Sequence, residues 1–148
     1  MDIGELALWE CHQILGRHTV GRIGVFTDGY PLVFPINYRF LTPESAVASV
    51  LIRTRPGNTI SRAMGPASFE IDEIDLAARR AVSVLVRGRL VKAARWTGLP
   101  DTNPWVTEQR DDWLALEIET ITGRRFLGRA EGAGDTAFDV EWQLVSAG

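Results

Sequence analysis

The chain consists largely of short runs in which apolar and polar residues alternate, with turn-forming residues between them. Alternation with a period of two is typical of β-strands that bury one face. The clearest run covers residues 81–93, where Gly88 interrupts a face of valines and leucine and indicates a bulge or a bend. Asp28-Gly29 separates two other runs and is a strong hairpin signal. This succession favours an antiparallel β architecture.

About six strands are predicted along the chain. They cover residues 18–27, 31–41, 46–54, 66–72, 81–93 and 112–122. A doubly wound parallel sheet would need a helix of roughly ten or more residues after most strands, and the sequence has no such pattern. We therefore expect a mainly β fold, either an antiparallel barrel or a sandwich.

Two helices are expected beside the strands. Residues 5–15 are predicted to form an amphipathic helix, with Leu8, Cys11 and Leu15 on one stripe. A second, shorter helix is predicted to begin near residue 58 and to end at about Met64. Both are too short to cover a whole sheet face, so they are expected to flank the strands.

The 148 residues are expected to form one domain with a single core. Within it, residues 1–16 hold the N-terminal helix and residues 128–148 form a C-terminal extension. A long connection rich in proline, aspartate and asparagine is predicted at 96–110. Residues 138–145 are predicted to form a final edge strand or an extended tail.

Composition and motifs exclude several classes of function. The net charge of −3 argues against general binding to nucleic acid or to a membrane surface. One cysteine and two histidines show no zinc-binding spacing. No signal peptide or membrane-spanning stretch is evident, so a cytoplasmic location is expected. Without a nucleophile elbow, Walker loop or dinucleotide fingerprint, any chemistry is expected to be carried by a cofactor.

Residues 53–62, RTRPGNTISR, are the strongest candidate for a binding site. A predicted strand ends in Arg53 and Thr54, and Pro-Gly then breaks the chain before Asn58 or Thr59 caps the short helix. Arginine binds phosphate in a bidentate manner, and a helix N-terminus offers free N–H donors to an anion. The segment therefore indicates a pocket for a terminal phosphate. Turn chemistry with a solvated arginine pair explains the same residues equally well.

Several segments in a fixed order resemble one family, the pyridoxamine 5′-phosphate oxidase-like, FMN-binding split-barrel proteins. They are Glu10-Cys11, Val20 to Val25 with Asp28-Gly29, Pro35 to Tyr38, Ile52 to Thr54 before Pro56-Gly57, Gly65 to Asp72, Val84 to Arg89, Pro104-Trp105, and Ile121 to Arg125. The resemblance covers about residues 5–127, and the chain is most similar to the short, mostly uncharacterised actinobacterial-type branch.

The resemblance implies a six-stranded antiparallel split β-barrel with short flanking helices. It also implies a homodimer that binds FMN at the subunit interface. Position by position, the isoalloxazine ring would be bordered partly by backbone groups of Pro35, Ile36, Asn37 and Tyr38. The phosphate and ribityl chain would be faced by Arg53 and Thr54, and the phosphate pocket completed by Asn58, Thr59 and, from the partner subunit, Arg124. Arg124 is alternatively expected to bridge the dimer.

Two departures from the family pattern limit the activity that is expected. Thr59 stands about where relatives often carry lysine, which removes one charge from the phosphate pocket. No histidine follows His18, so the C-terminal substrate motif of the true oxidases is missing. The leading hypothesis is an FMN-dependent oxidoreductase acting on a small molecule. The alternatives are a non-catalytic dimer that carries flavin, deazaflavin or haem, and a structural or regulatory dimer without a cofactor.

Overall fold

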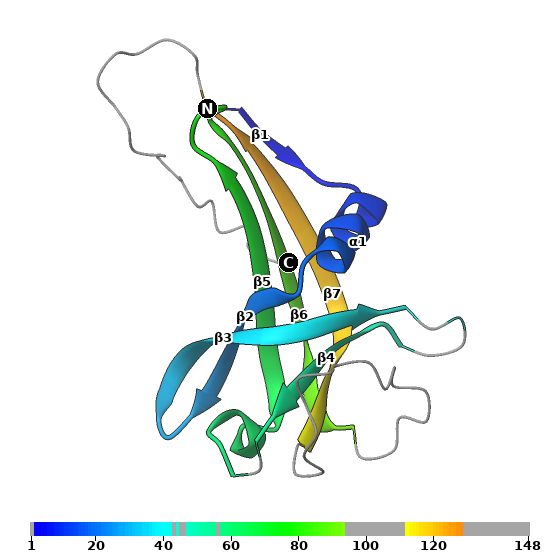
Figure 1. Ribbon diagram of the computed structural model, residues 1–148, viewed down its shortest axis with the longest axis vertical. Coiled ribbons are helices and arrows are strands. Elements are labelled where there is room, and N and C mark those ends of the chain that lie inside the picture. The colour runs from blue at the N-terminus through cyan, green and yellow to red at the C-terminus, as the bar shows by residue number, and fades with distance from the viewer. Residues whose placement is uncertain (1, 43, 45–46, 56, 94–111, 129–148) are drawn as a thin grey trace, which may run out of the picture.

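The computed structural model describes residues 2–42, 44, 47–55, 57–93 and 112–128 (Figure 1). Its elements are β1 (Asp2–Glu5), α1 (Leu8–Arg17), β2 (Val20–Thr27), β3 (Tyr30–Leu41), β4 (Ser49–Thr54), the 3-10 turn η1 (Ile60–Arg62), β5 (Gly65–Asp75), β6 (Arg80–Lys92) and β7 (Asp112–Leu127). The connection predicted at 96–110 and the strand or tail predicted at 138–145 lie outside the described residues.

Six strands pair in a closed, antiparallel ring. Around the ring the order is β2, β3, β4, β7, β6 and β5, and β5 pairs again with β2. The short β1 adds to β7 outside this ring. In Figure 1, β5, β6 and β7 run along the length of the molecule, while β3 and β4 cross them. This arrangement confirms the predicted mainly β fold and the six-stranded antiparallel split barrel.

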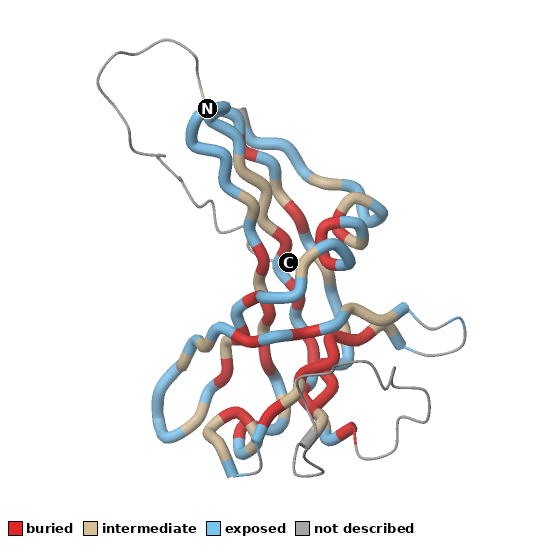
Figure 2. Tube along the Cα trace, viewed as in Figure 1, coloured by how far each residue is buried: buried red, intermediate tan, exposed pale blue. Residues whose placement is uncertain are grey.

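The core lies inside the ring, where alternate residues of each strand meet (Figure 2). Ile23 on β2, Phe69 on β5 and Leu114 on β7 are fully buried, as their alternating runs predict. Gly21 is required by this packing, because a Cβ atom there would lie 2.2 Å from the Phe69 ring. The predicted hairpin is also confirmed, since Asp28 (φ 54°) and its glycine neighbour (φ 81°) both adopt the left-handed region.

The N-terminal helix differs from its prediction. The helix is predicted over residues 5–15, but residues 2–5 form β1, and α1 starts at Leu8, which is 58% exposed and not on the buried stripe. Cys11, Ile14 and Leu15 carry the buried stripe. The shift occurs because residues 2–5 pair with the end of β7, so the helix can begin only after this pairing ends.

The last described strand is longer than predicted. The sequence predicts an end near residue 122, but β7 continues to Leu127 because β1 pairs with its final residues on one side and β6 on the other. Gly123 within this extension allows α1 to lie close, since a Cβ atom there would be 2.5 Å from Cys11 Sγ. None of the helices in the described part of the chain has the length and apolar character needed to cross a membrane.

Tyr38 joins the helix to the barrel, so removing its hydroxyl should destabilise the fold. The hydroxyl donates to the Leu15 carbonyl at 2.5 Å, near the end of α1, and burial raises the pKa of Tyr38 to about 12. Tyr38→Phe leaves that carbonyl without this donor, so we expect a loss of about 1 to 2 kcal/mol of unfolding free energy in urea titrations. Tyr30→Phe, at a tyrosine that is 68% exposed, is the control. Equal effects of both substitutions would contradict this role for Tyr38.

Candidate functional site

The barrel is split where β3 changes partners. Over its first part β3 pairs with β2, as far as Asn37 opposite Val20. From Tyr38, opposite Ile52, it pairs with β4 instead. Towards the start of β3, strands β3 and β4 diverge (Figure 1). Over residues 30–37, one edge of β3 therefore has no strand partner among the residues that the structure describes.

The open edge of β3 presents few hydrogen-bond donors. The N–H of Tyr38 donates to the Thr19 carbonyl at 2.9 Å, on the β2 side. N–H groups alternate in direction along a strand, so Asn37 directs its N–H to the open edge. Pro31 and Pro35 occupy two further outward positions of this edge and have no N–H. The predicted contribution of backbone groups is thus concentrated at Asn37 and Val33.

The four residues predicted to border a flavin ring alternate between the two faces of β3. Pro35 and Asn37 are exposed on the outer face. Ile36 and Tyr38 are 9% and 4% exposed and belong to the core, where the Tyr38 ring packs edge-on against Phe69. The side chains of Ile36 and Tyr38 are therefore committed to the fold. Because their N–H groups also face β2, a role for these two residues at a ligand stays a prediction.

Arg53 and Thr54 at the end of β4 also point to opposite faces. The Arg53 guanidinium lies 5.4 Å from the centre of the Trp113 ring on the neighbouring β7. Thr54 is only 5% exposed, and among the described residues its Oγ1 atom has no hydrogen-bond partner. A buried hydroxyl without a partner is costly. Among the predicted site residues, Thr54 is therefore the one that most clearly indicates a ligand, which would supply the missing hydrogen-bond partner.

The short helix predicted after β4 is a single 3-10 turn. Asn58 caps it, since its Oδ1 accepts from the Ser61 N–H at 2.9 Å, while Thr59 is half-buried and makes no capping bond. The turn ends at Arg62 because β5 already begins at Gly65. The predicted helix to about Met64 is thus shorter than expected, and the contribution of its N-terminus to anion binding stays a prediction. This turn lies near Arg53 and Thr54 because it follows them closely in the sequence.

Arg124 is not brought near the other predicted site residues within one subunit. Trp113, which pairs with Arg53, and Arg124 are eleven positions apart on β7. An extended strand advances about 3.3 Å per residue, so they are separated by roughly 35 Å. Arg124 lies beside β1 at the other end of the molecule. A role at the same site would require a second copy of the chain, as the prediction states.

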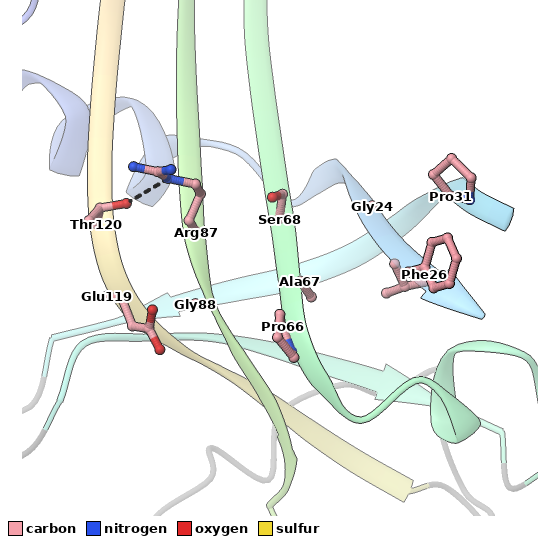
Figure 3. A pocket seen from close by; sticks show the side chains of 11 residues that line it. Gly24, Phe26, Pro31, Pro66, Ala67, Ser68, Arg87, Gly88, Glu119 and Thr120 are labelled. Atoms are coloured by element: carbon pink, nitrogen blue, oxygen red, sulfur yellow. Dashed lines mark hydrogen bonds between the residues drawn. The ribbon is translucent and has the colours of Figure 1, made fainter. Parts of the chain in front are cut away.

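A second feature, which sequence reasoning missed, is an open groove of about 630 Å3 on the outer face of β2, β5, β6 and β7. A row of residues crosses it, with neighbours on adjacent strands: Gly24, Ser68, Arg87 and Thr120. The Arg87 Nε atom donates to Thr120 Oγ1 at 3.2 Å, and Figure 3 shows this side chain turned towards β7. In the sequence, Gly24 within β2 is the one feature that could have indicated this groove.

The groove adjoins the turn after β4. Arg62 of η1 lies 3.6 Å from the Asp28 carboxylate in the β2–β3 turn. That hairpin carries Phe26 and Pro31, which line the groove, and Pro66 at the start of β5 lines it as well. The predicted phosphate turn and the groove are therefore neighbours.

Comparison with known protein families places the chain in one of them. A family model described as pyridoxamine 5′-phosphate oxidase matches residues 9–125. The chain belongs to this family, as its sequence motifs predict. No match was found among curated proteins.

Solved structures with a similar fold come from several bacteria. The chain is similar to an FAD-binding protein from Mycobacterium smegmatis, at 28% identity and a TM-score of 0.70, over 85% of this chain and 100% of that one. It is also similar to an FAD-binding protein from Mesorhizobium loti, at 25% identity and a TM-score of 0.63, over 84% and 99%. An FAD- and haem-binding protein from M. smegmatis shares the fold at 15% identity and a TM-score of 0.64, over 90% and 77%.

Proposed function

We propose that this protein binds a flavin at the split of its barrel and acts as an oxidoreductase on a small molecule. The observation that carries the proposal is the buried, unpartnered hydroxyl of Thr54, beside the open edge of β3. A flavin phosphate or ribityl hydroxyl would supply the missing partner. Family membership and the two FAD-binding relatives support a flavin over other cofactors.

FMN is the minimal flavin that this site would hold. Asn37 would offer its N–H to the ring, while Arg53, Asn58 and Thr59 would surround the phosphate from β4 and the turn. A bound flavin supplies hydride and electron transfer, and the protein holds and orients it. Among the residues proposed for the site, Tyr38 is the only acid or base other than arginine, and its proton is held by the Leu15 carbonyl. The proposed chemistry therefore uses no protein nucleophile.

Haem is the less favoured cofactor because of where the two histidines of the chain lie. The His12 ring packs edge-on against Phe40 at 5.2 Å. His18 Nε2 lies 3.2 Å from a Glu73 carboxylate oxygen. Neither contact is at the split of the barrel.

We further propose that the protein is a homodimer with the flavin at the subunit interface. Large apolar side chains on the β2–β3 hairpin support this, since Tyr30 and Val33 are each at least 65% exposed. A second subunit would cover such residues and could bring its Arg124 to the flavin. A monomeric mass at micromolar concentration would contradict the dimer.

The decisive experiment is an absorbance spectrum of the purified protein, taken as isolated and again after adding FMN or FAD and desalting. We expect a retained two-band flavin spectrum. Because a ligand that binds only the native state must stabilise it, we also expect added flavin to raise the melting temperature by several degrees. A colourless protein whose melting temperature neither flavin changes would overturn the proposal. With flavin retained, an NADPH-linked assay with several acceptors separates turnover from storage.

A further inference from the structure

We propose that the outer groove binds the adenylate half of FAD, so that this protein selects FAD over FMN. The inference rests on the proposed flavin site and specifies which flavin that site takes. It assigns a function to a groove that the flavin ring and its first phosphate would not fill. Four features of the groove support it: its position, its walls, its charge and its floor.

The position of the groove fits the second half of a dinucleotide. The first phosphate would lie at the turn after β4, and Arg62 of that turn is 3.6 Å from Asp28 at the tip of the β2–β3 hairpin. The groove begins on the same hairpin, at Phe26 and Pro31, and continues to Pro66 on β5. A ligand that extends from the turn past the Asp28–Arg62 pair enters the groove directly.

The walls of the groove suit a flat aromatic base. The Phe26 ring is 69% exposed on a strand face, where it contributes little to the core. Pro31 lies opposite it on β3, and Pro66 adds rigid apolar surface further along the groove, on β5. Stacking of a base on an aromatic side chain is worth about 1 to 3 kcal/mol, which corresponds to roughly 5- to 150-fold in affinity. The volume of about 630 Å3 lies in the range of small-molecule sites.

The charged residues of the groove suit a nucleotide. Arg87 offers a guanidinium whose Nε is held by Thr120, so its terminal nitrogens are positioned for a phosphate (Figure 3). Glu119 lies on the same side of the groove and offers an acceptor for ribose hydroxyls or an exocyclic amine. Ser68, between Arg87 and Gly24, provides a further hydroxyl.

The floor of the groove includes Gly24, whose lack of a side chain leaves the backbone accessible and which the fold does not require. A Cβ atom on Gly24 would meet only the Ser68 carbonyl oxygen, at an ordinary 3.8 Å. The contrast is Gly21 on the same strand, where a Cβ atom would collide with the core. Glycine within a strand costs stability relative to residues with side chains. Its presence at position 24 is explained if a ligand approaches the backbone there.

The test compares affinities for FAD and FMN, measured by quenching of flavin fluorescence, in the wild type and in Gly24→Val. We expect the wild type to bind FAD at least about tenfold more tightly than FMN. Gly24→Val should fold with an equal or higher melting temperature, reduce this preference to less than about threefold and leave the affinity for FMN unchanged. AMP alone should compete with FAD in the wild type. Gly16→Ala, where a Cβ atom would have no neighbour within 4 Å, is the control.

A second variant tests the groove without filling it. Arg87→Gln keeps an exposed polar side chain and should weaken binding of FAD but not of FMN. Equal affinities of the wild type for the two flavins, or an unchanged preference in both variants, would overturn the inference and leave the proposed flavin site intact. A change in oligomeric mass with an unchanged preference would make the groove a contact between subunits and would also overturn it. Binding of neither flavin would overturn the proposed function itself.

Discussion

Replacing Thr54 by valine is expected to weaken flavin binding by about 10- to 100-fold while stabilising the flavin-free protein. The hydroxyl is buried and lacks a partner among the described residues, so the free protein bears a desolvation cost of about 1 to 3 kcal/mol. Flavin binding would remove that cost by completing the hydrogen bond. Thr54→Val has no such cost to remove, and flavin titrations together with thermal unfolding measure both effects.

Ser49→Ala is the matched control for this prediction. Ser49 is buried on the same strand, but its hydroxyl already donates to the Val47 carbonyl at 3.2 Å. Its loss should lower stability slightly and leave flavin affinity unchanged. If Thr54→Val bound flavin as tightly as the wild type, the phosphate and ribityl chain would have to lie elsewhere.

Replacing Gly88 by alanine is expected to destabilise the protein more than removal of the Tyr38 hydroxyl does. β6 carries a bulge between Arg87 and Gly88, where its register with β7 shifts. A Cβ atom on Gly88 would lie 2.0 Å from the carbonyl oxygen of Glu117, and that oxygen belongs to the backbone of a central strand. The strands must separate to admit it, so we expect a loss of about 3 kcal/mol or more.

Urea-induced unfolding followed by circular dichroism measures this loss. The same substitution at Gly24, where a Cβ atom fits without collision, should leave stability equal or improved. Similar transitions for Gly88→Ala and the wild type would mean that the bulge can absorb a methyl group and that the glycine is not structurally required.

The strands can be predicted because local alternation and burial agree. Ile23, Phe69 and Leu114 lie in such runs and are buried where their runs place them. The bulge at Gly88 is also visible in the sequence, because glycine interrupts an otherwise regular strand. The start of α1 is not, because it depends on pairing between residues 2–5 and the distant end of β7. No local pattern encodes a contact of that range.

The sequence predicts the approximate location of the candidate site but not the orientation of its side chains. The break after Arg53 and Thr54 marks the turn, and strand order brings it beside the residues from Pro35 to Tyr38. The sequence does not indicate that Arg53 stacks on Trp113 while Thr54 is buried, because the face that each residue takes depends on the neighbouring strands. The groove draws two or three residues from each of β2, β5, β6 and β7 and one from β3, and it has no motif.

The two prolines on the open edge of β3 have a consequence for the behaviour of the protein at high concentration. An unpaired strand edge is a template on which another chain can add a strand, and such addition leads to fibrils or swapped assemblies. Pro31 and Pro35 remove two of the outward N–H groups that such a strand would need. The two prolines therefore hinder the addition of a strand from another chain at this open edge. The barrel can stay split there without promoting aggregation.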